Sequence, residues 1–318
     1  MVLIPLTGLL HFEQNVPLAI AIVVFASFLF ASGATIQHLA IGGTVDHGAE
    51  NPSMSVRQVL SLLSNPKWLL GLGTVVVGAS LHIVGLALAP VTVVQPVGIL
   101  AVPWSVLLAA KIHHFRPTRA IWGAVGLTIL GIAGFTFFSA STAAPDTRLP
   151  EGQVVTAVLL VFAIGAALGF IGQRGPAAAR CLMWASGGSF FYGLSSAMIK
   201  SLFEMLRHPD FLTRPLFWAV ICFLLVCYLG GGFMIQQGYA NGPAEIVVGS
   251  MTTTDPIVAV GFGIIVLGEG VRLTAGDGVG MVLSGAVAIA GVVILSRFHP
   301  DAQARRARAP EPAAAAEL

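Results

Sequence analysis

The sequence predicts an all-α polytopic membrane protein: about nine transmembrane helices arranged as two inverted four-helix repeats joined by a connector helix. Two compositional observations support the membrane assignment. Of 318 residues, 56% are apolar and only 9% are charged, whereas a water-soluble domain usually carries about a quarter charged residues. The apolar residues also form unbroken runs about twice as long as a β-barrel strand. The third observation is an internal repeat, described below.

Nine segments come close to the ~20 mostly apolar residues that a helix needs to cross a bilayer. The predicted spans are 16–41, 68–89, 91–110, 120–140, 154–171, 181–203, 216–235, 246–268 and 279–296.

Self-similarity predicts how these spans are grouped. A shift of 153 residues aligns 78–133 with 231–286 without a gap and gives eleven identities. The paired prolines, such as Pro103 with Pro256, carry more weight than the paired glycines and alanines, because proline is rarer here. One span separates the two sets of four, so the second set has the opposite orientation, as in many secondary transporters. The predicted parts are an N-terminal segment 1–15, a first repeat 16–140 with a cytoplasmic interfacial segment 42–66, a connector 154–171, a second repeat 181–297 and a disordered cytoplasmic tail 298–318.

The distribution of Lys and Arg predicts the orientation in the membrane. The loops on one side of the membrane, together with the C-terminal tail, hold eleven Lys and Arg residues, whereas the loops on the other side hold four. Basic loops stay in the cytoplasm. We therefore expect a multi-pass protein of the cell membrane with its N-terminus outside and its C-terminus in the cytoplasm.

Composition and motifs also narrow the function classes. A formal net charge of +2 is too small to indicate the basic surface that a nucleic-acid-binding protein needs. The sequence contains no Gly-x-x-x-x-Gly-Lys-Ser/Thr phosphate loop and no catalytic constellation, so we expect neither an ATP-driven pump nor an enzyme, and no cofactor. Glycine-rich helix faces serve either internal packing or a homodimer.

Asp255 is the sharpest candidate for a functional residue. It lies ten residues into the eighth predicted span and precedes Pro256. A carboxylate inside a membrane binds a proton, a cation or a basic partner. Thr252 and Thr253 add hydroxyl oxygens of the kind that a hard cation prefers, so Asp255 is the expected metal ligand if the substrate is a cation. The alternative is structural: Asp255 braces a helix break at Pro256.

Lys200 and His38 occupy equivalent positions under a second repeat shift of 162 residues. Lys200 either binds substrate or gates it, or else it snorkels to the interface or pairs with Glu204 one turn later. His38, beside Gln37, either takes part in proton coupling or packs as a hydrogen-bonded residue.

Prolines and polar side chains mark the remaining candidate positions. Helix breaks are expected at Pro96, Pro103 and Pro256, since proline removes a backbone donor. Gln95 offers both a donor and an acceptor to a cavity. Two further candidates, Gln236 and Tyr239, lie where the seventh span turns into the eighth and serve either substrate binding or helix capping.

Several stretches resemble the drug/metabolite transporter superfamily, in particular its EamA and NIPA-like bacterial branches. They are the segments 65–71 (NPKWLLG), 86–98 (LALAPVTVVQPVG), 236–245 (QQGYANGPAE), 254–258 (TDPIV) and 267–269 (LGE). The resemblance covers roughly 16–297 and implies transport of a small solute. Members of the superfamily carry sugars, amino acids, drugs, lipid-linked sugars or magnesium, and often place a basic residue where Lys200 stands.

The functional prediction is a secondary transporter that moves a small organic metabolite or drug by alternating access. A proton gradient or the gradient of the solute itself would drive it. Three alternatives remain open: a NIPA-type magnesium transporter, a flippase for lipid-linked sugars or polyprenyl phosphates, and a membrane scaffold that does not transport. The magnesium alternative is weakened by the scarcity of intramembrane carboxylates.

Overall fold

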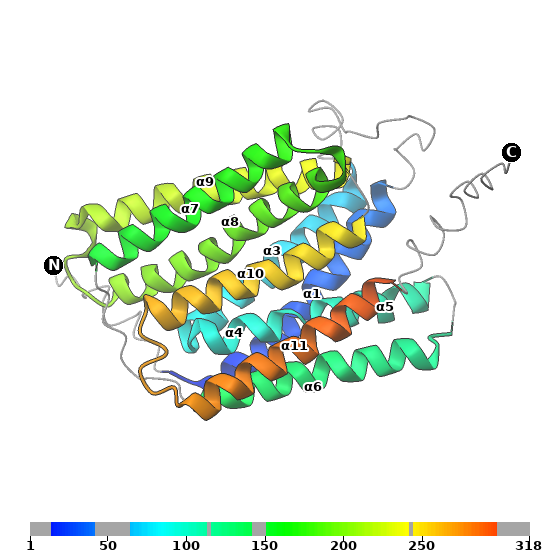
Figure 1. The fold of residues 1–318 in the computed structure, drawn as a ribbon, viewed down its shortest axis with the longest axis horizontal. Helices are drawn as coiled ribbons and strands as arrows, with labels where there is room; N and C mark the ends of the chain where they lie inside the picture. Colours follow the sequence, from blue (N-terminus) through cyan, green and yellow to red (C-terminus); the bar gives the residue numbers. More distant parts are fainter. Residues whose placement is uncertain (1–13, 42–63, 113–115, 142–150, 242–243, 298–318) are drawn as a thin grey trace, which may run out of the picture.

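A computed structural model describes residues 14–41, 64–112, 116–141, 151–241 and 244–297 (Figure 1). Every regular element in these ranges is helical, which confirms the predicted all-α class for the described chain. The elements are α1 (Val16–Ile41), α3 (Pro66–Leu88), α4 (Val91–Gly98), α5 (Ala101–Ile112), α6 (Arg119–Ser141), α7 (Glu151–Arg174), α8 (Ala177–Leu206), the 3-10 turn η2 (Phe211–Thr213), α9 (Pro215–Asn241), α10 (Ala244–Ile265) and α11 (Ala275–Arg297).

Each of the nine predicted spans coincides with a helix, and the third coincides with the pair α4 and α5. Within the described ranges, seven helical segments are long and apolar enough to cross a membrane: α1, α3, α4 with α5, α6, α7, α9 and α11. The remaining two, α8 and α10, lie among them; the apolar part of α10 is the shorter stretch 250–265. The described chain is therefore a multi-pass helical membrane protein.

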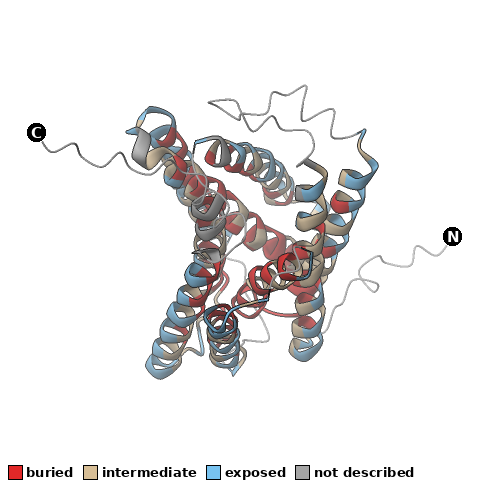
Figure 2. Cartoon of the chain, turned by 90° about the vertical axis from the view of Figure 1, so that its right-hand side faces the viewer, coloured by how far each residue is buried: buried red, intermediate tan, exposed pale blue. Residues whose placement is uncertain are grey.

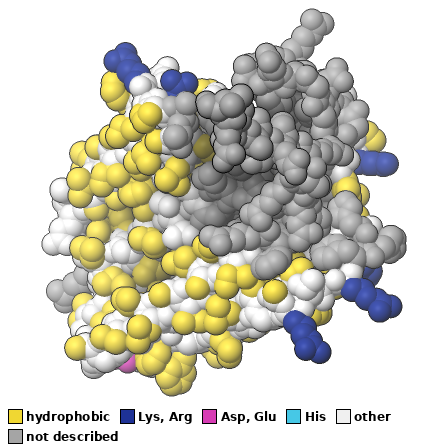
Figure 3. All heavy atoms as spheres, turned by 45° about the vertical axis from the view of Figure 1, so that its right-hand side comes forward, with side chains coloured by type: hydrophobic (Ala, Val, Ile, Leu, Met, Phe, Trp, Pro, Cys, Tyr) yellow, Lys and Arg dark blue, Asp and Glu magenta, His cyan; other side chains and the backbone are white. Residues whose placement is uncertain are grey.

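The surface of the bundle is apolar, as a lipid-facing surface must be. Large apolar side chains such as Leu130, Phe137 and Val282 are about 70% exposed on α6 and α11 (70%, 68% and 72%). Figure 3 shows hydrophobic side chains over the described surface in view, with Lys and Arg projecting at its edges. In Figure 2 the buried residues face the middle of the bundle and the exposed ones face outward. The exposed side chains are largely apolar, whereas those of a soluble helical bundle are mostly polar.

The helices pack in two sets of similar layout. In the first set, α1 packs on α3, α4 and α5, and α4 packs on α6. In the second, α8 packs on α9 and α10, and α10 packs on α11. The sets meet where α6 packs on α11 and α4 packs on α10, and α7 lies against α8 (Figure 1). The most buried element is α4, whose residues Val91–Val97 are all buried.

Glycines allow the closest contact between the two sets. A side chain at Gly131 of α6 would collide with the backbone of Ala288 in α11, and one at Gly291 of α11 would collide with Thr128 in α6. Only a residue without a Cβ permits this approach of backbones, which is how small residues hold membrane helices together.

Three expected segments fall outside the described residues. They are the N-terminal residues 1–13, the interfacial segment over 42–63 and the tail 298–318.

Candidate functional site

The chain leaves helical geometry between α3 and α4, in the interior of the bundle. Ala89 adopts an extended conformation with φ −148° and ψ 163°, and Pro90 follows it before α4 begins. The last carbonyl groups of a helix and the first N–H groups of the next have no partners within their own helices. Because this junction is buried, those groups need partners from elsewhere in the protein.

Glu269 supplies the partners for the start of α4. Its Oε1 accepts a hydrogen bond of 2.8 Å from the Val91 N–H, and its Oε2 accepts one of 2.9 Å from the Thr92 N–H. Glu269 is 2% exposed and lies in the connection between α10 and α11. Gly268 precedes it with φ +73°, a left-handed conformation that glycine adopts without steric cost. A Cβ at Gly263 would lie 2.7 Å from Oε2, so that glycine leaves room for the carboxylate.

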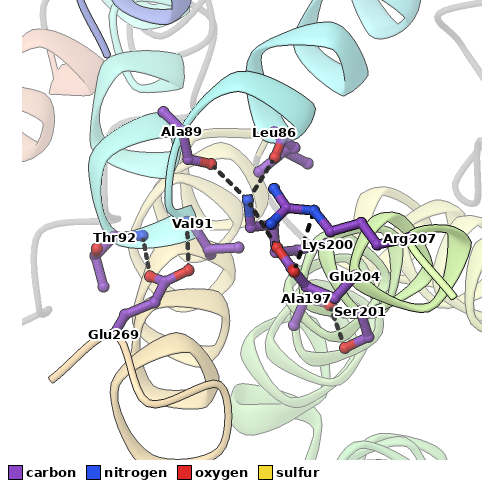
Figure 4. A network of polar contacts seen from close by, with 10 residues as sticks. All are labelled: Leu86, Ala89, Val91, Thr92, Ala197, Lys200, Ser201, Glu204, Arg207 and Glu269. Atoms are coloured by element: carbon purple, nitrogen blue, oxygen red, sulfur yellow. Dashed lines mark hydrogen bonds and ion pairs between the residues drawn. The ribbon is translucent and has the colours of Figure 1, made fainter. Parts of the chain in front are cut away.

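Lys200 supplies the partners for the end of α3. Its Nζ donates hydrogen bonds to the carbonyl oxygens of Leu86 at 3.0 Å and Ala89 at 3.2 Å. Glu204, one turn later in α8, lies 3.6 Å from Nζ, and Arg207 lies 3.5 Å from Glu204 (Figure 4). Lys200 is 1% exposed, so it does not snorkel to the interface. The expected pairing with Glu204 is present.

Lys200, Glu204, Arg207 and Glu269 form a charge network around the junction (Figure 4). The positive ammonium faces the carbonyl end of α3, and the negative carboxylate of Glu269 faces the N–H end of α4. Both placements match the helix dipoles, which favour cations at the C-terminus and anions at the N-terminus. The network thus joins α8 and the α10–α11 connection, both from the second half of the chain, to a helix junction in the first half.

A cavity of about 240 Å³ lies between α4, α6, α10 and α11. Its lining residues carry no charge. They come from both halves of the chain, near the middle of α6, α10 and α11 and at the C-terminal end of α4. The lining consists of Pro96, Ile99, Ile132, Phe135, Thr252, Thr253, Pro256, Ile257, Val260, Gly261, Gly285, Ala288 and Ile289. Thr252, Thr253, Pro96 and Pro256 are the sequence candidates that the structure brings together here.

The helix breaks differ from those expected. The third predicted span is interrupted after Gly98, at residues 99 and 100, rather than at Pro96 or Pro103, each of which lies within a helix. Pro103 occupies the third position of α5, where a missing N–H costs little. At Pro256 no interruption occurs, and α10 continues from Ala244 to Ile265. The expected break at Pro256 is therefore corrected to a continuous helix.

Asp255 does not line the cavity. A Cβ on Gly193 of α8 would lie 2.5 Å from the Asp255 carbonyl oxygen, so this side of α10 packs directly on α8. The carboxylate interacts electrostatically with Tyr192 of α8 and Tyr228 of α9. Its Oδ1 is buried and has no hydrogen-bond partner among the described residues. Because each residue of a helix is rotated by about 100° from the one before it, Asp255 and Thr253, two residues apart, point to different sides of α10.

The remaining candidates are not among the residues that line the cavity. Gln37 packs against α3, where its Cγ would lie 2.6 Å from a Cβ on Gly71. Gln236 is exposed near the end of α9. His38 belongs to α1 and Tyr239 to α9, but their side chains lie outside the described part of the structure. Gln95 is buried in α4, and its Nε2 has no partner in the described chain.

Sequence reasoning assigned no role to Glu269 or Arg207. Glu269 is an acidic residue between two glycines directly after an apolar helix, a position that is typical of a solvent-exposed loop. Only the tertiary structure shows that this loop reaches the start of α4, 178 residues earlier in the chain. A signal was nevertheless present, because the Gly268-Glu269 pair belongs to one of the stretches that resemble known transporters.

Comparisons with known proteins show one full-length similarity. The chain is 23% identical over 287 residues to an uncharacterized protein of Corynebacterium glutamicum, an alignment that covers 89% of this chain and 96% of the relative. No protein-family profile matches the chain. No solved structure matches it either.

Proposed function

We propose that the protein is a secondary transporter that moves a small, largely apolar organic solute by alternating access. The observation that carries this proposal is the uncharged cavity at the middle of the bundle, lined by α4 and α6 from the first half and by α10 and α11 from the second. A site shared between two halves near the membrane midplane is the arrangement that secondary transporters use. Relative movement of the halves would then open the site to either side.

The packing of the helices supports the inverted repeat on which this mechanism depends. Helix contacts within the first half have counterparts in the second. The second-half helices α8, α9, α10 and α11 pack on one another as α1, α3, the α4–α5 pair and α6 do in the first half. In the proposed arrangement α7 connects two sets of four spans, and the second set is inverted relative to the first. On the expected orientation, in the cell membrane, the charge network lies toward the outer face. This layout and the resembling sequence stretches favour membership of the drug/metabolite transporter superfamily.

The cavity also favours an organic solute over the alternatives. Its volume is slightly below the roughly 300–1,000 Å³ of drug-sized ligand sites, so it fits a small solute. Among the described residues, no three His, Cys, Asp or Glu side chains come together in a way that would hold a magnesium ion. A phosphate-bearing lipid would need a cationic pocket, whereas Lys200 is engaged by backbone carbonyls in this conformation.

A ligand screen by thermal shift tests the proposal. Gly261 lines the cavity and has open space around its Cα, so Gly261→Trp should fill the site without a steric clash elsewhere. Gly123 in α6 is also open but exposed on the outer surface, so Gly123→Trp is the matched control. The purified protein would be heated with amines, amino acids, nucleosides, sugars, polyprenyl phosphates and magnesium chloride.

We expect an organic solute to raise the Tm of the wild type and of Gly123→Trp, but not that of Gly261→Trp. A ligand at 100 times its Kd stabilises a native state by about 2.7 kcal/mol. A magnesium-dependent shift that survives Gly261→Trp would support the cation transporter instead. Equal shifts in both tryptophan variants would show that the cavity is not the binding site.

A further inference from the structure

A single unpaired carboxylate lies on the side of α10 that packs against α8, away from the cavity. Asp255 has a buried Oδ1 with no hydrogen-bond partner in the described chain. Asp255 as a whole is half-buried, but an ionised carboxylate with one buried, unpartnered oxygen inside a membrane helix is costly when no basic side chain of the described residues faces it. A bound proton would remove this charge.

The surroundings of Asp255 contain no cation among the described residues. α10 packs on α8, α4, α11 and α9. From α8 and α9 the groups that face Asp255 are the phenols of Tyr192 and Tyr228, whose rings are 6.2 Å apart. Lys200 lies two turns farther along α8 and is engaged by α3 and by Glu204. α4 has no titratable residue, and the carboxylate of Asp277 lies in the first turn of α11.

The backbones of α8 and α10 approach each other closely beside Asp255. A Cβ at Gly193 would lie 2.5 Å from the Asp255 carbonyl oxygen and 2.8 Å from Cβ of Val258, so α8 and α10 are in direct contact here. A sodium ion or an organic ammonium ion would need space and several more ligand atoms. A proton needs neither. It binds to a carboxylate oxygen, removes the charge and leaves the helix contact intact.

We propose that Asp255 is the proton-binding site that couples transport to the proton gradient, acting from the opposite side of α10 to the solute cavity. This inference rests on the proposed transport function. With the proton bound, the neutral carboxyl is compatible with the close α8–α10 contact of the described conformation. When the proton leaves, the buried charge favours a conformation in which this contact opens. Since the other face of α10 lines the cavity through Thr252 and Thr253, the same movement changes the solute site.

Infrared difference spectroscopy tests the proton site without any solute. The protein would be reconstituted in lipid and titrated from about pH 5 to about pH 9, a range that includes documented buried carboxyl groups. We expect a protonated-carboxyl band that disappears reversibly at high pH and is lost in Asp255→Asn. Asp255→Glu should retain a titrating band at a shifted frequency, which also shows that the site tolerates substitution. Asp277→Asn, at the exposed start of α11, is the matched control and should leave the band unchanged.

Two results would overturn the proposal. One is a band that is identical in wild type and Asp255→Asn, or that persists in the wild type over the whole titration. The other is a Tm increase with sodium chloride over choline chloride that is lost in Asp255→Asn, which would identify sodium as the bound cation. Either result leaves the cavity experiment with Gly261→Trp unaffected, so failure of the proton site is distinguishable from failure of the transport proposal.

Discussion

Replacing Lys200 by methionine should destabilise the protein more than any other removal of a single positive charge. Methionine has a similar length but cannot donate hydrogen bonds, so the Leu86 and Ala89 carbonyl oxygens lose a donor at 3.0 and 3.2 Å. Glu204 also loses an ion-pair partner at 3.6 Å while it remains 5% exposed. Removing one partner of a buried ion pair typically costs about 3–5 kcal/mol. At about 2 °C per kcal/mol for a large chain, the expected fall in Tm is roughly 6–10 °C.

The assay is thermal unfolding of the purified protein, with Lys111→Met as the matched control. Lys111 is exposed at the end of α5, so its replacement should change Tm very little. A double variant, Lys200→Met with Glu204→Gln, should recover part of the loss, because neutral glutamine no longer leaves a buried charge unpaired; coupling of roughly 1–3 kcal/mol is expected. A Tm for Lys200→Met equal to that of Lys111→Met would refute the assigned role of the charge network.

Three further predictions concern other contacts. Glu269→Gln keeps the shape of the side chain but can accept from only one of the two N–H groups at the start of α4, and we expect a loss of about 1.5–3 kcal/mol, measured by the same unfolding assay. Gly131→Ala should separate α6 from α11 and cost about 1–3 kcal/mol, whereas Gly126→Ala, with open space in the same helix, should cost nothing measurable; equal effects would contradict the glycine contact. The hydrogen bond from Arg214 holds the pKa of Asp210 below its usual value. This pair therefore stabilises the folded protein at pH values above the pKa that Asp210 has in the unfolded chain, and the stabilisation is lost as the pH falls through the lower pKa of Asp210 in the folded protein. Carboxyl NMR should show the pKa of Asp210 rising in Arg214→Gln.

The positions of the helices were predictable because the bilayer imposes a simple requirement. Backbone polar groups in lipid must be satisfied within the chain, and an apolar run of about 20 residues therefore forms a helix. Each predicted span coincides with a helix to within a few residues, as for 16–41 and α1 (Val16–Ile41). Hydropathy alone did not predict the break after Gly98, since the residues around it are as apolar as the rest of the span.

The site was only partly predictable, for a physical reason. Intramembrane charge is costly, so Lys200 and Asp255 could be identified as candidates from the sequence alone. Their partners could not be, since the groups that satisfy Lys200 are backbone carbonyls 111 and 114 residues away. The side of α10 on which Asp255 lies is likewise set by packing, through the contact with Gly193. Thr252 and Thr253 line the cavity, whereas Asp255, two residues after Thr253, does not.

Accessibility of the cavity from the two sides of the membrane tests the transport mechanism most directly. A single cysteine would be placed at Gly261 in a chain without Cys181, Cys222 and Cys227, then treated with a membrane-impermeant maleimide in intact cells and in inverted vesicles. Alternating access predicts labelling from both sides, and no labelling of a cysteine at the lipid-exposed Gly123 from either. Labelling of the Gly261 position from one side only, or from neither, would contradict the mechanism.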